Sequence, residues 1–151
     1  MKLKFKHQKF QEDAARAVCE VFSGQPLASH SYMVDPGKGQ GELFGTGFAN
    51  KPLVPGLTKE VMLSRIRSMQ RAQQIKPSDE LVGPGINLTI EMETGVGKTY
   101  TYIKTIYELN KLYGWCKFII VVPSIAIREG VYKSFQVTQE HFSNEYHKKI
   151  R

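Results

Sequence analysis

The segment from Met92 to Thr99, Met-Glu-Thr-Gly-Val-Gly-Lys-Thr, constrains the fold of this chain more than any other. An apolar stretch at 86–90 precedes it and a stretch with helical character at 100–113 follows it. This is the strand–loop–helix order of a phosphate-binding loop. Glycines in such a loop adopt backbone angles closed to other residues, so that amide N–H groups turn inward around a phosphate. The sequence therefore predicts a nucleotide site here.

Each position of the loop has an expected role. Lys98 would reach the β- and γ-phosphates of ATP, and the Thr99 hydroxyl would ligate Mg²⁺. The helix that follows would add the positive end of its dipole. The usual pattern begins with glycine, whereas Met92 stands there in this chain. The residues that we expect to bind the nucleotide at the loop are Thr94, Gly95, Val96, Gly97, Lys98 and Thr99.

Two other segments show weaker patterns. The glycine-rich run 35–41 contains Lys38, but neither a Ser or Thr nor a helical pattern follows it, so we interpret it as a flexible loop. The run Tyr32–Asp35 ends in a carboxylate, which could hold Mg²⁺ in an ATPase. It precedes the phosphate-binding loop and lacks a second acid, so we reject that role.

Composition limits the partners and the compartment. The formal net charge is +7 and the pI is about 9.4, which favours a polyanionic partner such as nucleic acid. Cys19 and Cys116 do not form a disulfide framework, and we expect reduced thiols in a cytoplasmic protein. The longest apolar run, 118–122, is far too short to span a membrane. The four histidines show no metal-ligand spacing; they are His7, His30, His141 and His147.

The second half of the chain alternates between two patterns. Extended apolar stretches at 86–91 and 118–122 are each followed by a helical pattern, at 100–113 and 125–138. Strand–helix–strand–helix implies an α/β fold with a parallel sheet and right-handed crossovers. The run 118–122 is typical of a strand buried on both faces. The side chains that we expect to face the sheet are Ile103, Ile106, Tyr107 and Leu109.

The first half of the chain is less regular. Leu3 and Phe5 alternate with lysines. The apolar residues that follow fall on one helical stripe, which comprises Phe10, Ala14, Val18, Val21 and Phe22. The segment 23–84 carries no recognisable functional pattern and is predicted to be an irregular insertion. Within it, 57–75 has helical character, and Thr58 can cap that helix. Gly114 is expected to end the helix that follows the phosphate-binding loop.

Three residues outside the loop are candidate ligand contacts. The Gln11 side chain can both donate to and accept from an adenine edge, although a glutamine at a helix start can equally face water. Ser124 and Arg128 follow the second apolar stretch. The carboxyl ends of parallel strands line a ligand crevice, so these two side chains could contact a nucleic-acid phosphate. An ordinary strand-to-helix turn is the alternative.

Together these segments resemble the first motor domain of helicase superfamily two. Phe10-Gln11-x-x-Ala14 resembles its Q motif, Met92–Thr99 its motif I, and 118–130 its motif Ia. Within that superfamily, Phe118–Val131 and the first residues of the chain are similar to the restriction (Res) subunit of type III restriction–modification enzymes. The resemblance implies that residues 1–151 form the N-terminal part of a RecA-like P-loop NTPase domain.

The resemblance also implies an activity. The family couples ATP hydrolysis to events on duplex DNA and cleaves DNA that lacks methylation, together with a modification subunit that is an adenine methyltransferase. Gln11 would contact adenine, and Ser124 and Arg128 would lie near DNA. Two alternatives remain open: a DNA or RNA helicase without nuclease, or a nucleotide-binding module without turnover. The latter applies to the isolated segment, because neither a second motor domain nor a catalytic group beyond Lys98 is recognisable.

Overall fold

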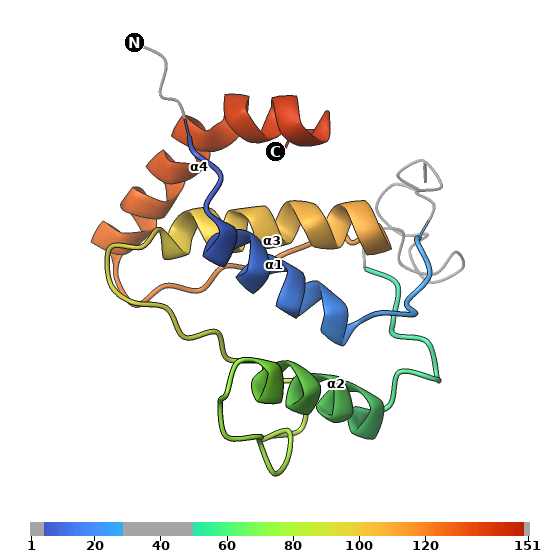
Figure 1. Cartoon of the computed structure of the whole chain (residues 1–151). Coiled ribbons are helices and arrows are strands. Elements are labelled where there is room, and N and C mark those ends of the chain that lie inside the picture. Colours follow the sequence, from blue (N-terminus) through green and yellow to red (C-terminus); the bar gives the residue numbers. More distant parts are fainter. Residues whose placement is uncertain (1–4, 29–49, 150–151) are drawn as a thin grey trace.

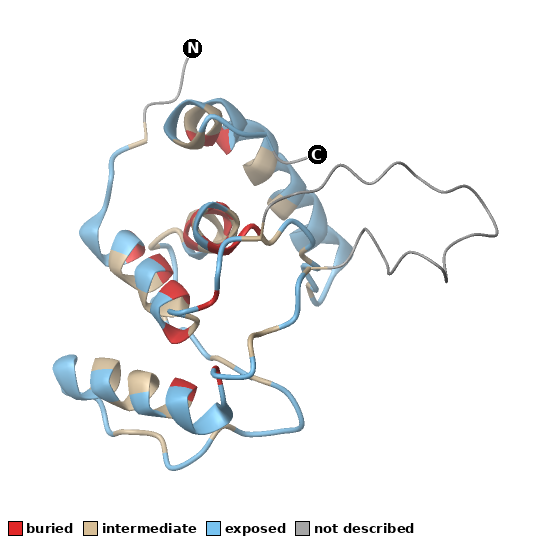
Figure 2. Cartoon of the chain, turned by 90° about the vertical axis from the view of Figure 1, so that its right-hand side faces the viewer, coloured by how far each residue is buried: buried red, intermediate tan, exposed pale blue. Residues whose placement is uncertain are grey.

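The computed structural model describes residues 5–28 and 50–149. This part of the chain contains four α-helices (Figure 1). They are α1 (Lys9–Val21), α2 (Lys59–Ala72), α3 (Lys98–Tyr113) and α4 (Ile125–Tyr146). The central helix is α3, which packs against α1 on one side and against α4 on another, while α2 packs against α1 (Figure 1). The buried residues accordingly lie mainly where α1 and α4 face α3 (Figure 2).

The interface between α1 and α3 is an apolar cluster. Cys19, Leu109 and Tyr113 are buried there, and Phe22, Trp115 and Phe118 pack around them. The Tyr113 hydroxyl donates a hydrogen bond of 2.7 Å to the Cys19 carbonyl, which satisfies the one polar group that the phenol brings into the cluster. Burial is also the main reason that the pKa of the Cys19 thiol rises to about 12.

Two side chains fix the start and the position of α2: Thr58 at its N-cap and Arg65 at its middle. Thr58 caps the helix as predicted, because its hydroxyl accepts a hydrogen bond from the Val61 amide. Arg65 donates from Nη1 to the carbonyls of Val21 and Ser23, at 3.0 and 2.7 Å. These carbonyls lie at the end of α1, where the last turn of a helix lacks internal partners. Arg65 therefore ties α2 to the carboxyl end of α1.

The predicted helix bounds hold at some ends and fail at others. The predicted stop at Gly114 is confirmed: its φ is +72°, and its amide bonds back to the Asn110 carbonyl. The helix before it begins at Lys98 rather than at residue 100. The prediction for α4 was too short, since this helix continues past Thr138 to Tyr146. The added turns carry Phe142, which is 0% exposed, and tertiary packing of this kind extends a helix beyond its local preference.

The predicted α/β fold, a RecA-like domain with a parallel sheet, is wrong for the part of the chain that the structure describes. The stretches 86–91 and 118–122 form neither helix nor strand there, and neither pairs with a neighbouring strand. Ile119 and Val121 are 92% and 87% exposed, although the pattern predicted burial on both faces. β-Branched residues favour extended backbone locally, whereas a sheet needs a hydrogen-bonded neighbour about 4.8 Å away. The residues expected to face the sheet instead contact helices: Ile103 and Tyr107 lie in a cluster with Phe142.

Several predictions concern residues that the structure does not describe. The glycine-rich run 35–41, the run Tyr32–Asp35 and His30 all lie outside the described residues. None of the described helices is both long enough and apolar enough to cross a membrane.

Candidate phosphate-binding site

The backbone between Met92 and Lys98 forms the turn that the sequence predicts. Gly95 and Gly97 have φ values of +84° and +85°, in the left-handed region that glycine enters without strain. Gly97 is also the N-cap of α3, and its carbonyl accepts the Thr101 amide at 3.0 Å. No side chain caps this helix start. The first amides of α3 are therefore free to bind an anion at the positive end of the helix dipole.

Lys98 spans the loop. Its Nζ donates a hydrogen bond of 2.8 Å to the carbonyl of Met92, at the opposite end of the turn. The side chain is exposed, and its partner is a neutral acceptor. A phosphate would offer a stronger, charge-assisted bond, so the ammonium can exchange the Met92 carbonyl for an anion. The role of Met92 is thus that of a backbone acceptor, which its side chain does not reveal in the sequence.

The structure brings Gln11 to the loop across 85 residues of sequence. Gln11 is only 8% exposed, and its Nε2 donates a 2.8 Å hydrogen bond to the Val96 carbonyl. A Cβ added at Gly97 would lie 2.6 Å from this nitrogen, so a larger residue there would displace the Gln11 amide in addition to straining the backbone at φ +85°. Because a carbonyl oxygen offers only lone pairs, the side-chain NH₂ must face Val96. The Oε1 of Gln11 then remains available to another donor.

The other predicted loop residues lie in the turn and in the first turn of α3. Thr99 is half-buried in the first turn of α3, directly after Lys98. Thr94 is exposed at the turn itself. Thr99 is the hydroxyl that could ligate Mg²⁺ here. Within the described residues, no group of three or more His, Cys, Asp or Glu side chains is arranged to hold a metal ion.

Ser124 and Arg128 lie at the start of α4. Ser124 is the N-cap of this helix, and its hydroxyl accepts a hydrogen bond from the Ile127 amide at 3.3 Å. Arg128 stands in the first turn and pairs with Glu129 at 2.9 Å. Both side chains of that pair are more than 60% exposed, at 67% and 63%, so the pair is weak and the guanidinium is accessible. The structure thus gives Ser124 a local capping role that the sequence analysis did not assign.

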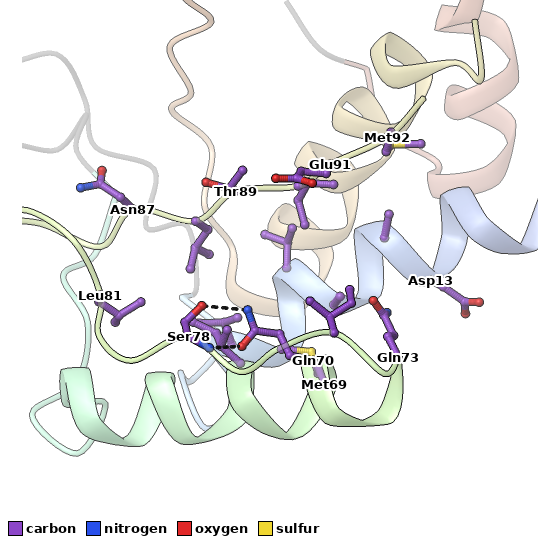
Figure 3. A pocket seen from close by; sticks show the side chains of 18 of the residues that line it. Asp13, Met69, Gln70, Gln73, Ser78, Leu81, Asn87, Thr89, Glu91 and Met92 are labelled. Atoms are coloured by element: carbon purple, nitrogen blue, oxygen red, sulfur yellow. Dashed lines mark hydrogen bonds between the residues drawn. The ribbon is translucent and has the colours of Figure 1, made fainter. Parts of the chain in front are cut away.

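A cavity of about 870 Å³ adjoins the loop (Figure 3). Its walls come from α1, α2, the segment 73–82 that follows α2 and the segment 87–93, and it borders the loop at Met92, Glu93 and Val96. On α2, Gln70 donates to the Ser78 hydroxyl and accepts from the Ser78 amide, both at 2.8 Å, which holds the next segment against the helix. The sequence analysis missed this cavity because its walls join segments that are far apart along the chain.

The comparisons with known proteins point in one direction. The family described as "Type III restriction enzyme, res subunit" matches residues 4–151. The chain is 38% identical over 98 residues to the EcoP15I Res subunit of Escherichia coli, and 37% identical over 98 residues to the EcoPI Res subunit of Escherichia phage P1. Each alignment covers 63% of this chain and 10% of the relative. The StyLTI Res subunit of Salmonella typhimurium is 45% identical over 62 residues, 40% of this chain and 6% of that relative. The chain therefore spans about a tenth of the length of these relatives.

Proposed function

We propose that this chain, which belongs to the family of type III restriction enzyme res subunits, forms the ATP-binding part of a DNA-dependent ATPase. In the proposed enzyme, ATP hydrolysis drives cleavage of unmethylated DNA. The relatives are named as Res subunits of restriction–modification enzymes, which supports this activity for the complete protein. The proposed partners are duplex DNA and a modification subunit. The observation that carries the nucleotide part of the proposal is the loop between Met92 and Lys98.

The geometry of the loop fits a nucleoside triphosphate. Two left-handed glycines, the uncapped start of α3 and the exposed Lys98 ammonium converge on one short turn. In this proposal the amides and Lys98 hold the phosphates, and Thr99 holds Mg²⁺. Bound Mg²⁺ would neutralise charge on the β- and γ-phosphates. The chain's own contribution is to place the phosphates and to supply fixed positive charge where negative charge develops.

Gln11 is proposed to link the base to the loop. Its Nε2 already donates one N–H to the Val96 carbonyl, so Oε1 and the second N–H are left to meet a base. Adenine presents its N6 amino group as a donor, whereas guanine presents the O6 acceptor at the equivalent edge. An acceptor at Oε1 would therefore favour ATP over GTP. The predicted adenine contact of Gln11 is thereby retained, and Oε1 is the atom that distinguishes adenine from guanine.

The DNA side of the proposal rests on the start of α4. Arg128 is accessible there, and its surface pair with Glu129 is weak enough to be exchanged for a phosphate. Ser124 would contribute through the geometry of the helix start, because its hydroxyl is already engaged as a cap.

The decisive experiment for the nucleotide site compares Lys98→Ala with Lys133→Ala. Lys133 is an exposed lysine on α4, so its removal has the same effect on net charge. A charge-assisted hydrogen bond contributes about 1.5–3 kcal/mol, so Lys98→Ala should raise the Kd for ATP about 10–100-fold in an equilibrium binding assay. Lys133→Ala should leave it unchanged. Equal affinity of both variants would refute the loop assignment.

The DNA-dependent part needs the complete natural protein with its modification subunit. We expect its ATP hydrolysis to be strongly stimulated by unmethylated duplex DNA. Turnover that does not respond to DNA would leave a nucleotide-binding enzyme of another class.

Gln11 allows a finer test with two variants. Gln11→Ala should reduce the preference for ATP over GTP about 2–10-fold, which corresponds to the loss of one hydrogen bond. Gln11→Glu keeps an acceptor for the base but places a carboxylate oxygen against the Val96 carbonyl. It should weaken binding of both nucleotides and retain more of the preference. Competition of ATP against GTP measures both effects, and an unchanged preference in Gln11→Ala would restrict Gln11 to the loop.

A further inference from the structure

A buried ammonium joins α3 to α4. Lys104 is 4% exposed, and its Nζ donates to Glu145 Oε1 at 2.7 Å and to the Tyr146 hydroxyl at 3.1 Å. The Tyr146 hydroxyl in turn donates to Glu108 Oε1 at 2.6 Å, which returns the chain of hydrogen bonds to α3. Neither the phosphate-binding loop nor the start of α4 uses these side chains. They form a polar network between two helices.

The network lies next to the phosphate-binding loop. Lys104 follows Lys98 by six residues on the same helix, about 9 Å along its axis. One turn closer to the loop, the Tyr100 hydroxyl lies 2.8 Å from Nε2 of His141 on α4. The first turns of α3 therefore contact α4 at two successive levels. Any displacement of the loop end of α3 acts directly on α4.

The other end of α4 carries the proposed DNA contacts. The helix is continuous from Ile125 to Tyr146, and it curves along its length (Figure 1). The hydroxyls of Ser134 and Thr138 bond back to carbonyls one turn earlier, at 2.8 Å each, and such bonds are associated with bent helices. The network thus anchors the last turns of the helix whose first turn presents Arg128.

The contact between α3 and α4 contains a buried charged pair, Lys104 with Glu145, which is uncommon between packed helices. Burying an ammonium is unfavourable unless it is paired, and apolar residues of similar volume often stabilise a fold as well or better. What a buried pair can add is a single preferred arrangement, because Nζ must reach both Glu145 and Tyr146 at once. The Lys104 network is therefore better suited to fixing the position of α4 relative to α3 than to stabilising the fold.

We propose that Lys104 is a positioning residue that fixes α4 across α3 and thereby couples the phosphate-binding loop to the DNA-facing start of α4. The inference rests on the proposed function. It predicts that removing the Lys104 ammonium affects nucleotide binding and DNA-stimulated hydrolysis differently. Nucleotide binding depends on the loop and should persist, whereas stimulation of hydrolysis by DNA depends on the coupling and should be lost.

The test uses the complete natural protein with its modification subunit and compares Lys104→Met with Lys133→Met. Two quantities are measured: the Kd for ATP, and the ratio of hydrolysis rates with and without unmethylated duplex DNA. Lys104→Met should keep the Kd within about threefold and lower the stimulation ratio by a factor of about 5–150, the usual range of coupling between sites. Lys133→Met should change neither quantity.

A second variant separates coupling from folding. The double substitution Lys104→Met with Glu145→Leu removes both charges, so no carboxylate is left without its partner. We expect it to bind ATP normally and still to lack stimulation. Wild-type stimulation in this variant would overturn the inference and leave the network a purely structural role. If DNA does not stimulate ATP hydrolysis by the wild-type protein, the proposed function itself is refuted. That outcome is seen without any variant.

Discussion

The two sides of α3 are buried in different ways. On the α1 side, the contacts are apolar, with Cys19, Leu109 and Tyr113 at their centre. On the α4 side, Phe142 and Tyr107 stack with ring centroids 5.1 Å apart, but Lys104, Glu145 and their partners surround them with hydrogen bonds. Apolar burial is non-directional and follows the area removed from water, whereas a polar network stabilises only one geometry. The α1 side should therefore tolerate change that the α4 side does not.

The largest expected effect is on the free energy of unfolding. It compares two positions, one on each side of α3, that are each changed to methionine. Lys104→Met should lower the free energy of unfolding by about 3 kcal/mol. This is the low end for breaking a buried pair, because the Glu145 side chain is 25% exposed and can regain some water. Leu109→Met on the α1 side conserves volume and should cost less than about 1.5 kcal/mol. Urea unfolding followed by circular dichroism measures both, and equal losses would remove the distinction between the two sides.

A smaller effect is expected from the hydrogen bond inside the apolar cluster on the α1 side. Tyr113→Phe removes the hydroxyl that donates to the Cys19 carbonyl. That carbonyl also accepts the Phe22 amide at 3.0 Å, so it does not become unsatisfied. The loss should be about 1 kcal/mol, or about 2–4 °C in Tm.

Tyr132→Phe is the matched control for that substitution, because Tyr132 is 62% exposed and its hydroxyl can bond to water. A loss well above 2 kcal/mol in Tyr113→Phe would show that the α1 side also depends on directional contacts.

The two sides also differ in how far the sequence revealed them. Of the apolar stripe predicted on α1, only Val21 is buried, and Phe10 is 47% exposed. The burial of Ile103, Tyr107 and Leu109 on α3 was predictable from helical periodicity. Their partners were not, because periodicity gives the face of a helix but not the element that covers it. The predicted sheet failed for this reason: the run 118–122 has the composition of a buried strand, yet its pairing partner is a non-local property.

The candidate site shows the same division. The turn between Met92 and Lys98 was predictable, because the left-handed glycines and the helix that follows are set by neighbouring residues. The bond from Gln11 to the Val96 carbonyl and the pair of Lys104 with Glu145 join residues that are 85 and 41 positions apart. No local pattern marks Lys104 as buried, since lysine is rarely buried.

The smallest expected effect is a dependence of stability on acid pH that belongs to the α4 side alone. Burial lowers the pKa of His141 below 6.5; Glu145 opposes this shift, and His7 and Lys104 add to it. The unfolded chain then binds a proton more readily than the folded one, so this contribution is complete above pH 6.5 and is lost as the pH falls below it. Burial alone would raise the pKa of Glu145, but Lys104 outweighs burial and lowers it, so a second loss follows as the pH falls below 4.5.

Urea midpoints at pH 7.5 and 5.5 isolate the first of these losses, because Glu145 remains ionised at both values. His141→Gln should flatten the difference between the two midpoints. Leu109→Met should preserve it, because burial raises the pKa values of Cys19 and Tyr113 on the α1 side and moves their titration further above neutral pH. Acid therefore acts on the contact that fixes α4 and spares the contact that holds α1. If the difference between the two midpoints is unchanged in His141→Gln, the acid sensitivity does not come from His141. The two sides of α3 would then not differ in their response to acid.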